Sequence, residues 1–185
     1  LDLYIGIYKL YRKRWLKMYK IIDNAISKKD QKYIQQLVLD NKLFPWFFMK
    51  DVTSKSKKQS RPAFSHYFVI NKKQNSSAVN NLKSIFKKYI KKEIIHFKSI
   101  LQLPLNTKKV SYDTPHTDIE EPHTVYLYYV NDSDGETILF KDEKIHKKVK
   151  PKKGRMLIFD GKTLHTAYQP IKNIRCVLNI NEARQ

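Results

Sequence analysis

Cysteine and glycine are scarce in this sequence, and long apolar runs are absent. Cys176 is the sole cysteine among 185 residues, so no internal disulfide can form, and a reducing compartment, the cytoplasm, is expected. The 4 glycines argue against glycine-rich loops that cradle nucleotide phosphates. No stretch approaches the roughly 18 apolar residues of a membrane span, and the first residues lack the basic-then-apolar order of a signal peptide.

Acidic residues are also few relative to basic ones. The chain has 37 Lys and Arg residues against 17 Asp and Glu residues, which gives a formal net charge of +20. A charge of this size suits an anionic partner such as nucleic acid. Lysine far outnumbers arginine, however, and an AT-rich genome produces the same bias. The charge therefore leaves nucleic acid open as a partner without pointing to it.

The first part of the chain, about residues 1–95, has mainly helical periodicity. The apolar content of 41% and the aromatic content of 12% are enough for one domain with one core. Two shorter apolar segments, Phe44 to Met49 and Phe64 to Ile70, are typical of strands, and the first is expected to be buried. Thr53 to Arg61 is polar and predicts a loop. The apolar spacing predicts helices over Tyr4 to Ile22, over Lys28 to Asn41 with Ser27 as N-cap, and over Ala78 to Ile95.

From about residue 96 to 181 the period becomes strand-like. Short apolar runs separated by turn signals indicate an antiparallel sandwich or barrel. With helices before it, the expected fold class is α+β: a double-stranded β-helix (jelly roll) with N-terminal helices packed outside, in a single domain of residues 1–185. The expected strands are Ser99 to Leu105, Lys108 to Tyr112, His123 to Val130, Thr137 to Phe140, Ile145 to Val149, Met156 to Phe159, Leu164 to Tyr168 and Arg175 to Ile180.

A possible metal site begins at His116 and Asp118, which follow Pro115. In an extended segment, residues two apart point to the same side, so both can reach one cation. His165 is a candidate third ligand, and two histidines with one carboxylate are typical of non-haem Fe(II) oxygenases. His-x-Asp alone is also common in surface turns. Arg175, expected on the strand neighbouring His165, adds a guanidinium that can hold a carboxylate with two N–H groups.

In their order and spacing, these elements resemble the 2-oxoglutarate/Fe(II)-dependent dioxygenase superfamily. The similarity is to its prolyl-4-hydroxylase-like branch, of the small phage and marine bacterial type, and runs from about Ser111 to Asn181. The matching elements are His116-Thr117-Asp118, Tyr128-Tyr129-Val130-Asn131, Gly135-Glu136-Thr137, Gly154-Arg155-Met156-Leu157-Ile158-Phe159-Asp160, Leu164-His165-Thr166 and Arg175.

The resemblance implies specific roles. His116, Asp118 and His165 would bind Fe(II), and Arg175 would pair with the distal carboxylate of 2-oxoglutarate. The hydroxyl of Tyr129 would contact the same carboxylate, although an aromatic strand residue is as often part of the core. With O2, the reaction would hydroxylate an unactivated C–H bond and release succinate and CO2. Because the imidazoles must be neutral to bind iron, binding should weaken at acidic pH.

Asp134 stands before Gly135 where many members of that superfamily have a second glycine, so the turn there is expected to differ. The substrate cannot be read from the sequence; a peptidyl side chain or a small molecule is favoured. One alternative is a nucleic-acid demethylase on the same metal core. Such enzymes carry a second arginine a few residues after the first, whereas the next one here is Arg184. The other alternative is a catalytically inactive jelly-roll binding module.

Four histidines and the cysteine remain outside the predicted site. His123 is expected at a solvent-exposed strand end, and His96 and His146 at the surface. His66 can point inward, but exposure is the expectation. Cys176 should face away from Arg175 and is interpreted as a small buried residue rather than a nucleophile.

Overall fold

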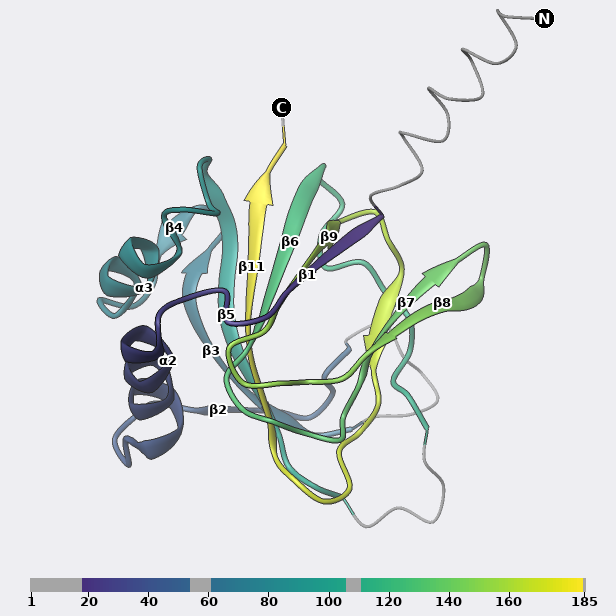
Figure 1. The fold of residues 1–185 in the computed structure, drawn as a ribbon, viewed down its shortest axis with the longest axis horizontal. Helices are drawn as coiled ribbons and strands as arrows, with labels where there is room; N and C mark the ends of the chain where they lie inside the picture. The colour runs from purple at the N-terminus through teal and green to yellow at the C-terminus, as the bar shows by residue number, and fades with distance from the viewer. Residues whose placement is uncertain (1–17, 54–60, 106–110, 185) are drawn as a thin grey trace, which may run out of the picture.

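The protein forms two facing antiparallel β-sheets with two short helices on one side (Figure 1). The computed structural model describes residues 18–53, 61–105 and 111–184. The large sheet has the order β1-β9-β6-β11-β5-β3-β2, with β4 paired to β3, and the small sheet has the order β10-β7-β8. The strands are β1 (Tyr19–Ile22), β2 (Phe47–Met49), β3 (Ala63–Ile70), β4 (Lys73–Gln74), β5 (Ile94–Gln102), β6 (His123–Tyr129), β7 (Thr137–Lys141), β8 (Lys144–Val149), β9 (Met156–Asp160), β10 (His165–Ala167) and β11 (Arg175–Ala183).

The two helices cover the outer face of the large sheet. Helix α2 (Lys28–Gln35) continues into the π-helical turn η1 (Gln36–Asp40), and α3 (Val79–Phe86) lies beside it (Figure 1). Ser27 accepts a hydrogen bond from the backbone N–H of Asp30, which confirms it as the N-cap. Apolar residues of both helices join one core with β3, β5, β6 and β11. The predicted α+β jelly roll with helices packed outside is therefore confirmed.

Helix α3 is shorter than predicted. The helix expected over Ala78 to Ile95 ends at Phe86, and β5 begins at Ile94. The carboxylate of Glu182 accepts the backbone N–H groups of Lys91 and Lys92. These bonds keep the segment before β5 out of a helix, because the N–H groups of Lys91 and Lys92 bond to β11 rather than to the preceding turn.

The prediction of a helix over Tyr4 to Ile22 is wrong at its C-terminal end. Residues 4–17 lie outside the described part of the chain, but Tyr19–Ile22 forms strand β1, paired with β9. Tyr19 and Ile21 alternate with their neighbours and pack on the inner core between the sheets. An apolar residue at every second position fits a strand better than a helix.

The segment Phe44 to Met49 was expected to be a buried strand and is neither fully buried nor fully strand. Only Phe47–Met49 pairs, as the edge strand β2, and Phe47 and Phe48 are 61% and 65% exposed. Of the predicted loop Thr53 to Arg61, residues 54–60 lie outside the described part, as do 108–110 of the strand predicted over Lys108 to Tyr112. The strand predicted over Ser99 to Leu105 is displaced, because β5 runs from Ile94 to Gln102; the remaining strand predictions of the second half are confirmed to within a few residues. Within the described ranges, no helix is long and apolar enough to cross a membrane.

Strand β11 divides the interior into two faces. Cys176, Leu178 and Ile180 belong to the core under the helices, which confirms Cys176 as a small buried residue. The alternate residues face the small sheet. Because residues directly opposite in neighbouring strands share a face, the register pairs Arg175 with Gln102, Val177 with Ile100, Asn179 with Lys98 and Asn181 with His96 on this inner side.

His123 is buried rather than exposed at the start of β6, with 1% of its surface accessible. Its Nδ1 lies 2.7 Å from the carbonyl oxygen of Glu121. The ring lies directly against Gly161: a Cβ added to that glycine would come within 2.3 Å of the imidazole. No sequence pattern predicts this contact, because the partner of the ring is a glycine without a side chain.

Replacing Gly161 by alanine is expected to destabilise the fold, because either the ring or the turn must move. We expect a loss of about 2 kcal/mol in the free energy of unfolding, which corresponds to roughly 4–8 °C in Tm for a domain of this size. Circular dichroism during heating measures it. Lys162→Ala, at the exposed neighbouring position, should change Tm little. Equal Tm values for the two variants would contradict the packing of His123 on Gly161.

Candidate metal centre

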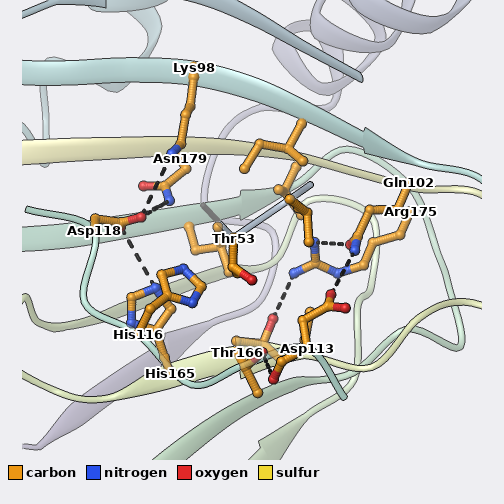
Figure 2. A pocket seen from close by; sticks show the side chains of 16 residues that line it. Thr53, Lys98, Gln102, Asp113, His116, Asp118, His165, Thr166, Arg175 and Asn179 are labelled. Atoms are coloured by element: carbon orange, nitrogen blue, oxygen red, sulfur yellow. Dashed lines mark hydrogen bonds and ion pairs between the residues drawn. The ribbon is translucent and has the colours of Figure 1, made fainter. Parts of the chain in front are cut away.

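Three predicted ligands meet at the open end of the space between the sheets. One ligand atom from each of His116, Asp118 and His165 lies within 4.8 Å of the others, and Figure 2 shows the three side chains converging. The backbones of His116 and His165 exchange two N–H···O hydrogen bonds of 3.0 Å, which extends the small sheet by one bridge. This pairing brings residues 49 positions apart to one place.

Both imidazoles are oriented for metal binding through Nε2. Nδ1 of His116 lies 3.0 Å from the carbonyl oxygen of Thr114, and Nδ1 of His165 lies 3.0 Å from that of Thr163. Because a carbonyl can only accept, each Nδ1 carries the proton and each Nε2 keeps a lone pair. Burial lowers the pKa of His165 to about 4, so this imidazole is neutral at pH 7.

The carboxylate of Asp118 is held by three side chains of the large sheet. Asn179 Nδ2 donates to both carboxylate oxygens, at 3.3 and 3.0 Å, and Asn181 Nδ2 donates to Oδ2 at 2.9 Å. Lys98 Nζ lies 3.8 Å from Oδ1. Burial alone would raise the pKa of Asp118, but Lys98, His165 and the two amides outweigh it and lower the pKa well below its usual range. The group is therefore an anion, as a metal ligand requires.

Arg175 lies at the opposite side of the same pocket (Figure 2). It belongs to the large sheet and faces β7 and β10, so the prediction that its strand neighbours that of His165 is wrong. Its Nε donates to the carbonyl oxygen of Gly135, Nη1 to Gln102 and Nη2 to Thr137, at 2.9, 3.0 and 2.9 Å. A guanidinium has five N–H groups. One N–H on each terminal nitrogen is left without a partner among the described residues.

The turn before β7 makes room for Arg175. A Cβ on Gly135 would lie 2.9 Å from Cδ of Arg175 and from the carbonyl oxygen of Tyr168. Asp134 accepts the backbone N–H groups of Ile171, Lys172 and Asn173. The aspartate that departs from the related pattern therefore ties this turn to the loop before β11.

Tyr129 lies behind the pocket rather than on its wall. Its hydroxyl donates to Thr137 Oγ1 at 2.8 Å, the same oxygen that accepts from Arg175 Nη2. Burial raises the pKa of Tyr129 to about 12. Direct contact of Tyr129 with a co-substrate stays a prediction. In the structure Tyr129 contacts Thr137, and Thr137 in turn contacts Arg175. Tyr128 is buried on the other face of β6, in the core under the helices.

A second buried ion pair adjoins Arg175. Asp113 is 2% exposed, and its Oδ1 lies 3.2 Å from Nε of Arg61. Arg61 also donates to the carbonyl oxygen of Ser111 at 2.9 Å, and Gln102 donates to Asp113 Oδ2 at 3.4 Å. Burial raises the pKa of Asp113, although both arginines oppose the shift. These bonds anchor the segment that leads to His116. No sequence pattern predicts these bonds, because Arg61 lies at the end of a polar stretch without periodicity.

The other histidines do not join the triad. His66 is buried, contrary to expectation; its ring packs between Phe44 and Phe68, and its Nδ1 lies 3.0 Å from the carbonyl oxygen of Pro45. His96 is half-buried on β5, and His146 is exposed on β8 as predicted.

Comparisons with known proteins bear on the fold. No protein-family model and no curated protein sequence matches the chain. Among solved structures, a 2OG-Fe(II) oxygenase family oxidoreductase from Burkholderia pseudomallei has a TM-score of 0.70 and 11% identity, over 91% of this chain and 86% of that one. The viral collagen prolyl hydroxylase of Paramecium bursaria Chlorella virus-1, in its 2OG complex, has 0.61 and 16%, over 91% and 98%.

A third structure is a prolyl hydroxylase from Trichoplax adhaerens in complex with a hypoxia inducible factor peptide fragment. It has a TM-score of 0.63 and 16% identity, over 91% of this chain and 84% of that one. The chain thus has the fold of the 2-oxoglutarate- and Fe(II)-dependent oxygenases, including prolyl hydroxylases. At these identities the likeness concerns the fold alone.

Proposed function

We propose that this chain is an Fe(II)- and 2-oxoglutarate-dependent oxygenase that uses O2 to hydroxylate an unactivated C–H bond, with release of succinate and CO2. One observation carries the proposal: two histidines and an aspartate converge within 4.8 Å in a pocket whose other wall holds a buried arginine, two of whose N–H groups have no partner among the described residues. A metal site and a carboxylate site in one pocket are what this chemistry needs.

The residues fit Fe(II). Both Nε2 atoms are lone-pair donors, and Asp118 is ionised and oriented by Asn179 and Asn181. Two imidazoles and one carboxylate bind a ferrous ion and leave positions open for other ligands. The iron, when bound, supplies the activation of dioxygen that no side chain can provide.

The chain's own residues would bind and orient. The two free N–H groups of Arg175 suit both oxygens of the distal carboxylate of 2-oxoglutarate. Gln102, Thr137 and Gly135 hold the guanidinium, so little reorganisation is required on binding. Ile100, Leu127 and Val177 form apolar walls between Arg175 and the triad, which would exclude water from the reacting atoms.

Anaerobic titration of the chain with Fe(II) and 2-oxoglutarate tests the proposal. A visible charge-transfer band that needs both components is expected, followed by succinate release on admission of O2 with a panel of peptides, nucleotides and small metabolites. Peptides belong in the panel because the Trichoplax protein was solved with a peptide. A chain that binds neither component would instead be an inactive jelly-roll module.

Asn181→Ala is expected to weaken metal binding by about 10- to 100-fold, because partners that orient a ligand contribute on that scale. The loss of stability should be small, since Oδ1 of Asn181 is buried with no hydrogen-bond partner among the described residues and its removal relieves that cost. Isothermal titration with Mn(II) measures the affinity. Asn173→Ala, at an exposed position on the loop before β11, is the control and should bind as wild type. Unchanged affinity in Asn181→Ala would mean that the amide does not orient Asp118.

A further inference from the structure

A second hollow adjoins the triad on the side away from Arg175. Its wall contains Met49, Tyr67 and His96, together with His116 and Asp118. Arg175, Gln102, Thr137 and His165 line only the first pocket, whereas Lys98 lines both. A co-substrate held by Arg175 would fill the first pocket, so the second hollow is the approach that remains for a substrate.

Lys98 extends from the inner face of β5 toward Asn179 and Asp118 (Figure 2), where it lines both hollows. Its side chain is only 17% exposed. The ammonium lies 3.8 Å from Asp118 Oδ1 and 5.7 Å from the centre of the Tyr67 ring. It donates no hydrogen bond to any residue of the described part of the chain. Apart from this ion pair with Asp118, the three N–H groups of Lys98 are available to a ligand that enters the hollow.

Metal binding would leave less negative charge beside the ammonium group of Lys98. Asp118 is the nearest anion to Lys98, and a divalent cation on Asp118 would take up much of that negative charge. No other carboxylate of the described residues forms an ion pair with Lys98. His96 adds no charge at pH 7, because burial and then Lys98 lower its pKa, and its Nε2 lies 2.8 Å from Asn71 Oδ1.

We propose that Lys98 binds a carboxylate of the substrate beside the metal, so that the substrate of this chain is a carboxylic acid. This inference rests on the proposed function and adds the substrate class. Asp51 lines the same hollow and accepts the backbone N–H of Thr53 with one oxygen. A substrate with one carboxylate and one ammonium group therefore matches the charges of the hollow better than a dianion does.

The test uses a matched set of small probes: pentanoate, pentanamide and norvaline. The chain is loaded with Mn(II) and saturating 2-oxoglutarate, which keeps the probes away from Arg175, and the paramagnetic relaxation of probe protons measures binding near the metal. Pentanoate should bind about tenfold or more tighter than pentanamide, as expected for a charge-assisted hydrogen bond. Norvaline should bind more tightly still.

Lys98→Met should remove the preference for pentanoate, Lys98→Arg should keep it, and Lys144→Met, at an exposed position of β8, should behave as wild type. Equal binding of pentanoate and pentanamide to the wild type overturns the proposal, even if Lys98→Met does not fold. Tenfold weaker 2-oxoglutarate binding in Lys98→Met with the preference intact also overturns it, because the lysine would then serve the co-substrate. If norvaline binds no more tightly than pentanoate, Asp51 does not bind the ammonium group, and that part of the proposal is wrong. A wild type that binds neither Mn(II) nor 2-oxoglutarate instead contradicts the proposed function.

Discussion

Replacing Asp118 by asparagine is expected to abolish Fe(II) binding while leaving the fold intact. The neutral amide removes the anionic ligand, and its loss should exceed the roughly 100-fold effect of losing a residue that only orients a ligand. Succinate release should fall below about 1% of wild type. The fold should survive because asparagine has the same shape and its carbonyl oxygen can still accept from Asn179 and Asn181.

The measurement is the thermal stability gained on adding Fe(II) anaerobically, since a ligand that binds only the native state raises Tm. Wild type should gain stability and Asp118→Asn should not, while both should melt alike without metal. Asp142→Asn, at an exposed turn between β7 and β8 where asparagine tolerates the positive φ, is the matched control. An Asp118→Asn protein that still gains stability from Fe(II) would contradict the assignment of the triad as the metal site.

The second half of the chain could be predicted well because its signals are local. Alternating apolar residues between turn residues gave nearly every strand from β6 to β11, and a two-residue spacing put His116 and Asp118 on one side of an extended segment. His165 and Arg175 required the order of motifs as well. The structure brings the predicted triad together and sets Arg175 across the same pocket.

Features that depend on register or on distant partners could not be predicted. Asn179 and Lys98 share a face because β11 pairs with β5 in one particular register, and no local pattern fixes that register. The chain between α3 and β5 leaves the helical path where Glu182, 91 residues beyond Lys91, accepts the backbone N–H of Lys91. Arg184, which follows Arg175 too late in the sequence to be the second arginine of a demethylase, pairs with Asp160 and donates to Thr124, so it gives the demethylase alternative no support.

Arg175→Gln is expected to raise the KM for 2-oxoglutarate by roughly 100-fold or more, because a buried charge-assisted pair with a carboxylate is lost. Metal affinity should stay within about threefold of wild type, since the guanidinium contacts Gly135, Gln102 and Thr137 rather than the triad. Burial lowers the pKa of Arg175, but an arginine stays charged throughout the physiological range. The effect should therefore not depend on pH between about 6 and 8.

The diagnostic measurement is selectivity between 2-oxoglutarate and 2-oxopentanoate, which lacks the distal carboxylate. Wild type should strongly prefer 2-oxoglutarate, and Arg175→Gln should accept both with similar, low kcat/KM, because the guanidinium is what distinguishes them. Arg184→Gln changes the same residue type at the other end of β11, where Arg184 bonds Asp160, and should keep wild-type selectivity. If Arg175→Gln still preferred 2-oxoglutarate by the wild-type factor, the co-substrate carboxylate would have to bind elsewhere. The buried pair of Arg61 and Asp113 would then need to be tested next, because Asp113 lines the same pocket and Arg61 is its ion-pair partner.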